Sequence, residues 1–190
     1  HERAFGITSS NVAPHAGVVK KPYDKTRIPG GSSGGTAVAI AAGIVTCGLG
    51  SDTGGSTRVP AALCGIVGLR PSVGNGGAER RYDDQNLVVP ISHTRDTVGP
   101  MGRTVADVAL LDSVITATAM AKPEPLSGKR FGIPASFWGG LDRDLETVTK
   151  AARDKLASAG AVMVDVDMPG LFDLNAKVSF PIALHEPIAD

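Results

Sequence analysis

Two short clusters of glycine and serine contain the residues whose types and spacing could do chemistry. Residues 30–35 are Gly-Gly-Ser-Ser-Gly-Gly, and residues 50–58 are Gly-Ser-Asp-Thr-Gly-Gly-Ser-Thr-Arg. The small residues before Ser56 leave successive backbone N–H groups free to point at one anion, which is what an oxyanion hole requires. A serine hydroxyl becomes an oxygen nucleophile once a neighbouring group takes its proton. The second cluster therefore indicates acyl transfer, whereas the first cluster alone is typical of a flexible loop.

Two other interpretations of these clusters, a nucleophile elbow and a nucleotide-binding motif, do not fit the sequence. Residues 30–34 satisfy the Gly-x-Ser-x-Gly pattern of a nucleophile elbow, which requires a strand before the serine. Residues 20–29 contain two prolines and five charged side chains, so they do not predict a core strand. Neither cluster matches a phosphate-binding motif, and no dinucleotide fingerprint follows a predicted strand. We therefore reject the elbow and find no support for nucleotide binding.

Taken together, the two clusters resemble the amidase signature. In that signature a Gly-Gly-Ser-Ser-Gly-Gly segment precedes an alanine-rich helix and a second glycine-serine run, which here spans residues 50–71. Ser56 follows Ser32 by 24 positions, which also matches. The likeness continues through residues 91–101 and covers at least residues 5–115. It implies an amidase of the Ser-cisSer-Lys type, a hydrolase acting on linear amide C–N bonds without a metal or organic cofactor.

The resemblance also implies a role for each matching residue. Ser56 would be the acylated nucleophile, and Ser32, following a cis peptide bond, would relay its proton to a lysine. The backbone amides implied for the oxyanion hole are those of Thr53, Gly54, Gly55 and Ser56. The residues implied to support the loop are Ser33, Asp52 and Arg58. A hydrogen bond or ion pair between Asp52 and Arg58 would brace the nucleophile loop.

The lysine is where this sequence departs from the family. The family's lysine lies many tens of residues before the first cluster, which would place it upstream of His1. Lys20, Lys21 and Lys25 are too close to Ser32 to match it, and they are more simply solvated loop charges. We therefore expect residues 1–190 to form a partial amidase-signature domain, truncated at both ends, without the catalytic lysine.

Histidines offer an alternative general base for a serine nucleophile. His15, His93 and His185 could suggest a Ser-His-Asp triad, but no local pattern marks one of them as a base. The Ser-Ser-Lys scheme needs no histidine. We therefore favour the serine relay over the triad.

The expected substrate follows from resemblance within the family. Residues 87–97 and the cluster around Ser56 look most like bacterial hydrolases of small aryl-substituted acetamides, with mandelamide as the first expected substrate and indoleacetamide as the second. Amidotransferase subunits share the signature and form one alternative. An inactive, acyl-binding fragment is the non-enzymatic alternative, and the expected absence of the lysine favours it.

The composition of the chain limits the classes of partner that we expect it to bind. Lysine plus arginine and aspartate plus glutamate number 19 each, and the basic residues are scattered, so neither nucleic acid nor an anionic membrane is expected. The longest apolar stretch, residues 36–47, is far shorter than the roughly 20 residues of a membrane span. No secretory signal pattern is present, so the cytoplasm is the default location. The expected partner is a small-molecule amide, and a homodimer stays open.

The elements that must position the clusters follow from apolar periodicity. We expect an α/β fold with a mixed central sheet covered by helices. Residues 36–47 predict a buried helix, residues 59–69 a short helix and a strand, and residues 74–86 an exposed loop. Thr104 and Asp107 predict a capping box for a helix over residues 105–118. Its expected apolar side comprises Val105, Val108, Ala109, Leu111 and Ile115.

The last third of the chain predicts a separate strand–helix–strand unit. Residues 129–134 and 161–168 are expected as strands, and residues 143–158 as an amphipathic helix that ends at Gly160. This alternation is typical of helices packed on a parallel or mixed sheet.

Overall fold

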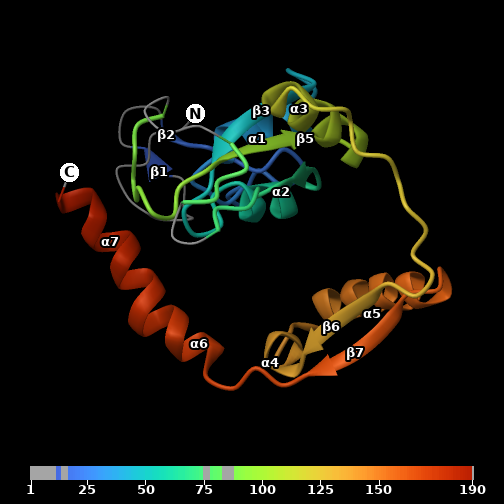
Figure 1. The fold of residues 1–190 in the computed structure, drawn as a ribbon. Helices are drawn as coiled ribbons and strands as arrows, with labels where there is room; N and C mark the ends of the chain where they lie inside the picture. The colour runs from blue at the N-terminus through green and yellow to red at the C-terminus, as the bar shows by residue number, and fades with distance from the viewer. Residues whose placement is uncertain (1–11, 14–16, 75–77, 83–87, 190) are drawn as a thin grey trace. The chain divides into compact units, whose positions relative to one another are not determined.

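The structure is a computed structural model that describes residues 12–13, 17–74, 78–82 and 88–189 (Figure 1). The chain divides into two compact units, which are described separately. The first contains residues 1–121 and 179–190, and the second contains residues 122–178. That both units belong to one partial domain stays a prediction.

The first unit is built on a three-stranded antiparallel sheet. Its order is β3 (Cys47–Ser51), β5 (Val98–Gly102) and β4 (Val67–Gly68), so the last strand in sequence lies in the middle. A separate antiparallel pair joins β1 (Val12–Ala13) to β2 (Gly17–Val18). The second glycine-serine cluster begins at the end of β3, so the sheet fixes the point where the loop that contains Ser56 leaves it.

Two helices follow the two clusters and form the core with the sheet. The helices are α1 (Gly34–Ala41) and α2 (Arg58–Cys64), which pack against each other. The buried core residues are Ala37, Ile40, Ala61, Cys64 and Met101. Most of these side chains are small, so the helices can approach the sheet closely. The core therefore lies directly behind both clusters.

The prediction for residues 36–47 is right about the helix and wrong about its end. Helix α1 stops at Ala41, and Cys47 already begins strand β3. Gly43 ends the helical run with a φ of +77°, a left-handed conformation that favours glycine. The apolar residues after it are exposed, and Ile44 keeps 74% of its accessible surface. Because the apolar composition continues across this break, hydrophobicity alone could not locate it.

The predictions for the next two elements are largely confirmed. Residues 59–69 form α2 and the short strand β4, as expected. Helix α3 (Val105–Thr116) has the predicted capping box: Thr104 Oγ1 accepts the Asp107 N–H at 3.1 Å, and Asp107 Oδ2 accepts the Thr104 N–H at 2.9 Å. The helix ends two residues early because Ala117 adopts a φ of +52°. Val105 was expected on the apolar side but is 71% exposed.

The predicted exposed loop at residues 74–86 contains a buried anchor. Residue 74 and residues 78–82 lie in neither helix nor strand, while residues 75–77 and 83–86 lie outside the described residues. Tyr82 is buried, which contradicts the prediction, and its hydroxyl donates to Asp112 at 2.7 Å. Arg81 donates twice to the same carboxylate, at 2.8 and 2.6 Å. A side chain with a polar tip can be buried once that tip has a partner, and sequence polarity could not reveal this partner.

The second unit confirms the predicted strand–helix–strand order. Strand β6 (Arg130–Pro134) pairs in parallel with β7 (Val162–Val166), and α5 (Arg143–Ser158) connects them. Asp142 caps α5 by accepting the Leu145 N–H at 2.9 Å, and Gly160 follows the helix with a φ of +91°. The remaining helices are α4 (Ala135–Trp138), α6 (Leu171–Leu174), a π-helix (Asn175–Ser179) and, in the first unit, α7 (Phe180–Ala189).

In the part of the chain that the structure describes, none of the helices is both long enough and apolar enough to cross a bilayer.

The capping box gives a first testable prediction. Thr104→Ala removes the hydroxyl that accepts the Asp107 N–H, and we expect the free energy of unfolding to fall by about 1 kcal/mol. Urea denaturation of the protein measures this loss. Thr104→Ser keeps the hydroxyl and is the matched control. An equal loss in both variants would show that the methyl group, rather than the cap, accounts for the effect.

Candidate active site

The two glycine-serine clusters meet through Ser33. Its backbone N–H donates to the carbonyl oxygen of Ser56 at 3.1 Å. Its hydroxyl accepts the Ser51 N–H at 3.2 Å and donates to the Ser51 carbonyl at 3.3 Å, so the first cluster is also fixed to the end of β3. Ser33 is fully buried. The Ser33–Ser56 hydrogen bond therefore brings together two segments whose serines, Ser32 and Ser56, are 24 positions apart in sequence.

The backbone around Ser32 has the conformation that the amidase resemblance implies. The Gly31–Ser32 peptide bond is cis. The Ser32 side chain is buried, and Ser56 is half-buried. The described residues between Val18 and Ser32 form turns and one isolated bridge rather than a strand, so the rejection of a nucleophile elbow is confirmed.

The residue after Ser56 fits into a space bounded by glycines. Thr57 is fully buried, and its Oγ1 has no hydrogen-bond partner among the described residues. A Cβ added to Gly99 of β5 would lie 2.5 Å from Thr57 Oγ1, and one added to Gly68 of β4 would lie 3.2 Å from Thr57 Cγ2. A Cβ added to Gly50 of β3 would lie 2.7 Å from Ser33 Oγ. These glycines allow Thr57, which follows Ser56, and Ser33, which follows Ser32, to approach the sheet.

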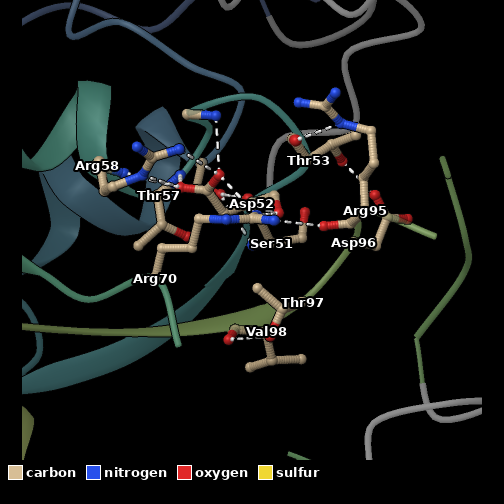
Figure 2. Close-up of polar contacts among 12 residues, drawn as sticks. Ser51, Asp52, Thr53, Thr57, Arg58, Arg70, Arg95, Asp96, Thr97 and Val98 are labelled. Atoms are coloured by element: carbon tan, nitrogen blue, oxygen red, sulfur yellow. Dashed lines mark hydrogen bonds and ion pairs between the residues drawn. The ribbon is translucent and has the colours of Figure 1, made fainter. Parts of the chain in front are cut away.

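The carboxylate of Asp52 organises the loop that contains Ser56 (Figure 2). Its Oδ1 accepts the Gly55 N–H at 2.8 Å, and its Oδ2 accepts the Thr57 N–H at 3.2 Å. Arg58 donates to both oxygens, through Nε at 3.0 Å and Nη2 at 3.1 Å. Arg70 adds an ion pair at 3.1 Å. The loop from Asp52 to Arg58 is therefore folded around one buried carboxylate.

The surroundings of Asp52 keep it ionised. Burial, the largest single influence, acts to raise the pKa of this carboxyl group. Hydrogen bonds and charge from Arg58, the Gly55 amide and the charge of Arg70 outweigh burial, so the pKa lies below its ordinary value. In turn, the hydrogen bond to Asp52 raises the pKa of Arg58. Because Asp52 is fully buried, this is not a plain surface pair, although its contribution to turnover stays a prediction.

The predicted oxyanion-hole amides differ in what they contact. The Gly55 amide donates to Asp52, while those of Thr53, Gly54 and Ser56 have no acceptor in the described part of the chain. Gly55 has a φ of +125°, which strongly favours glycine. A bound oxyanion would therefore share the Gly55 amide with Asp52 or use the other three. The assignment of these amides stays a prediction.

The histidines show no triad geometry in the described residues. His93 lies 3.6 Å from Glu186 of α7, and His185 is exposed on the same helix. His15 lies outside the described residues. The lysines match their expected solvated character: Lys20 and Lys25 are exposed, and Lys21 is half-buried.

Three site residues were missed by sequence reasoning. Arg70 bonds the main chain and carboxylate of Asp52, and its Nη2 donates to the Arg95 carbonyl at 2.7 Å. Arg95 and Asp96 in turn contact Thr53 (Figure 2). Arg70 lies in residues 50–71, and Arg95 and Asp96 lie in residues 91–101, two stretches that carry the family resemblance. No local periodicity marks them, because their partners are 18 to 43 positions away.

The fold, the paired serines and the nucleophile loop define the class of protein. A family model described as Amidase matches residues 1–189. This chain belongs to the amidase family, and the expected amidase-signature fold is confirmed by its similarity to solved members.

Three relatives show the extent of the similarity. The chain is 46% identical to an indoleacetamide hydrolase of Agrobacterium vitis and 41% identical to a mandelamide hydrolase of Pseudomonas putida, in each case over 98% of its own length. It matches the structure of a glutamyl-tRNA(Gln) amidotransferase subunit from Thermotoga maritima with a TM-score of 0.81 at 30% identity, over 97% of the chain and 42% of that structure. The chain spans 38% and 36% of the two hydrolases. Identity is thus higher to the indoleacetamide hydrolase than to the mandelamide hydrolase, the reverse of the expected order.

Replacing the buried carboxylate tests its structural role. Asp52→Asn leaves two guanidinium groups without their counter-charge, so we expect the free energy of unfolding at pH 7 to fall by about 3 kcal/mol. Chemical denaturation measures the change. Asp24→Asn, which removes an exposed carboxylate paired with Arg27 at 3.2 Å, is the matched control and should change stability little. Equal effects of the two substitutions would contradict the bracing role.

The same variant has an expected pH dependence. Because the pKa of Asp52 is lower in the folded protein than its ordinary value of 3.8, the ionised form stabilises the fold. This stabilisation is fully present above pH 3.8 and is lost as the pH falls through the folded pKa. The stability difference between wild type and Asp52→Asn should therefore be constant near neutral pH and shrink below pH 3.8. A difference that grows on acidification would contradict the assigned ionisation.

Proposed function

We propose that the protein containing this chain hydrolyses the C–N bond of a small aryl-substituted carboxamide, releasing the acid and ammonia through an acyl-enzyme on Ser56. The observation that supports this most directly is the hydrogen bond from the Ser33 amide to the Ser56 carbonyl. It brings the cluster with the relay serine against the cluster with the nucleophile. The hydrogen bonds between Ser33 and Ser51 join the same two clusters at the end of β3.

The proposed reaction begins with a proton transfer. The Ser56 hydroxyl attacks the amide carbonyl while Ser32 accepts its proton and passes its own to a lysine kept neutral by burial. That lysine is expected outside this chain. The developing oxyanion is stabilised by main-chain amides before Ser56. The relay then returns a proton to the departing ammonia, and water entering by the same path hydrolyses the acyl ester.

The charges near the nucleophile loop favour this chemistry. Asp52 contributes one negative charge, whereas Arg58 and Arg70 contribute two positive charges to the same cluster. Negative charge that develops on the substrate oxygen would be attracted by this excess. Asp52 itself faces the guanidinium groups and the loop amides, so its own charge is compensated there.

The substrate class rests on the named relatives. Indoleacetamide and mandelamide are both primary amides with an aryl group one carbon from the carbonyl. The higher identity to the Agrobacterium vitis enzyme makes indoleacetamide the first substrate to test. The amidotransferase likeness, at 30% identity, supports the alternative less strongly.

Ammonia release tests the proposal. The comparison is between residues 1–190 and a polypeptide that extends upstream of His1, each with indoleacetamide and mandelamide. We expect activity only in the extended polypeptide, because it would include the lysine. Activity in residues 1–190 alone would contradict an external lysine, and silence of the full-length protein with both amides would contradict the proposed activity.

Serine variants of the extended polypeptide separate the two catalytic roles. Ser56→Ala should reduce turnover by about a thousandfold or more because no nucleophile remains. Ser32→Ala should reduce it by about 10²–10⁴-fold because the proton relay is lost. Ser113→Ala, whose hydroxyl donates to a helix carbonyl on α3, is the control and should be fully active. Full activity of Ser56→Ala would exclude it as the nucleophile.

A further inference from the structure

A tight turn at residues 92–96 lies against the nucleophile loop. The amides of Arg95 and Asp96 both donate to the Ser92 carbonyl, at 3.0 and 2.8 Å. The Asp96 side chain also stabilises the start of the turn. Its Oδ2 accepts the N–H groups of Ile91 and Ser92, the latter at 2.9 Å. The conformation of the turn is therefore fixed by its own hydrogen bonds.

Two side chains outside the 92–96 turn hold it in place. The guanidinium of Arg80 donates to two of its carbonyl groups, those of His93 and Asp96. Glu186 of α7 is buried and accepts hydroxyl hydrogen bonds from Ser92 and from Thr94, the second at 2.7 Å. In addition, Arg95 Nη1 donates to the Ser179 carbonyl at 2.6 Å. The turn is a fixed support within the first unit.

This support contacts Thr53, the first residue of the predicted oxyanion hole (Figure 2). The Thr53 hydroxyl donates to Asp96 Oδ1, and Arg95 Nε donates to the Thr53 carbonyl oxygen at 3.3 Å. The Asp52 amide also donates to the Thr97 carbonyl at 2.9 Å. Thr53 is thus held at both its side chain and its carbonyl group.

Holding these carbonyl groups fixes the direction of the neighbouring amides. A peptide unit is planar and trans, so its N–H points opposite to its C=O. Arg95 holds the Thr53 carbonyl, which sets the direction of the Gly54 N–H. Arg70 holds the Asp52 carbonyl, which sets the direction of the Thr53 N–H. The side chains act on the carbonyl side, and the amides are left for another acceptor.

We propose that Asp96 is a positioning residue: it holds Thr53 through the threonine hydroxyl and, together with Arg95 and Arg70, orients the Gly54 and Thr53 amides toward the substrate oxyanion. This inference rests on the proposed function. Asp96 does not touch the reacting atoms. Its effect appears in the transition state, when the oxyanion forms, rather than in substrate binding.

The test uses Asp96→Asn and Thr53→Val in the full-length protein that contains this chain. Asparagine offers one acceptor oxygen to three donors, and valine removes the hydroxyl while keeping the shape. Each variant should lower kcat for indoleacetamide or mandelamide by about ten- to a hundredfold, with KM changed less than about threefold. Both substitutions break the Thr53–Asp96 hydrogen bond, so the double variant should lose no more turnover than the worse single variant. Thr53→Ser should recover most of the turnover lost in Thr53→Val.

A matched control separates positioning from general loss of stability. Asp112 is a buried carboxylate on α3 that accepts from Arg81 and from Tyr82 and does not contact the nucleophile loop in the described structure. Asp112→Asn should lower stability without changing kcat below the melting temperature. If Asp96→Asn behaves in the same way as Asp112→Asn, the inference is overturned.

A second readout keeps this inference separable from the substrate proposal. An alkyl fluorophosphonate phosphonylates a reactive serine with loss of fluoride and places its P=O oxygen where the oxyanion would lie. Its labelling rate at Ser56, read by mass spectrometry, should fall about tenfold or more in Asp96→Asn. If wild type labels but hydrolyses neither amide, the substrate proposal fails and the labelling rates still decide this inference. If wild type neither labels nor hydrolyses, both fail.

Discussion

The buried charge of Asp52 is the constraint on which the geometry of this site depends. A carboxylate removed from water is costly unless donors surround it. Here those donors come from the loop itself, from the first residue of α2 and from Arg70 beyond β4. The carboxylate is fully satisfied only when all of these segments are folded. The position of Ser56 is therefore coupled to the folding of the first unit.

A second constraint is space. The chain contains 24 glycines, and three of them on the strands, Gly50, Gly68 and Gly99, lie where a Cβ would collide with Ser33 or with Thr57. Thr57 directly follows Ser56, the proposed nucleophile, and Ser33 directly follows Ser32, the proposed relay serine. The glycines thus let the two segments approach the sheet and, through the Ser33–Ser56 hydrogen bond, each other. A glycine content that in the sequence alone is typical of flexible loops is, at these positions, a result of close packing.

Local signals in the sequence predicted much of the fold. The capping box of α3, the full extent of α5 and the strands on either side of it all depend on residues within one turn or one alternating run. The errors arose where a single glycine ends a helix inside an apolar stretch, or where a residue distant in sequence decides burial. The end of α1 depends on Gly43 within a continuous apolar stretch, and the burial of Tyr82 depends on Asp112, which lies 30 positions later. The serines were predicted, but Arg95 and Asp96 were not, because their contact with Thr53 exists only after β5 pairs with β3.

Residues distant in sequence matter here because their side chains can set the direction of backbone groups in the loop. An oxyanion hole made of backbone amides has no side chain of its own through which its geometry could be set. Its direction depends on the carbonyl groups of the same peptide units, and side chains act there. In the loop that contains Ser56, the Asp52 carbonyl accepts from Arg70 and the Thr53 carbonyl accepts from Arg95, and both arginines follow Ser56 in sequence. Side chains distant in sequence thus act on the direction of the Thr53 and Gly54 amides, which are backbone groups that a substitution at Thr53 or Gly54 leaves in place.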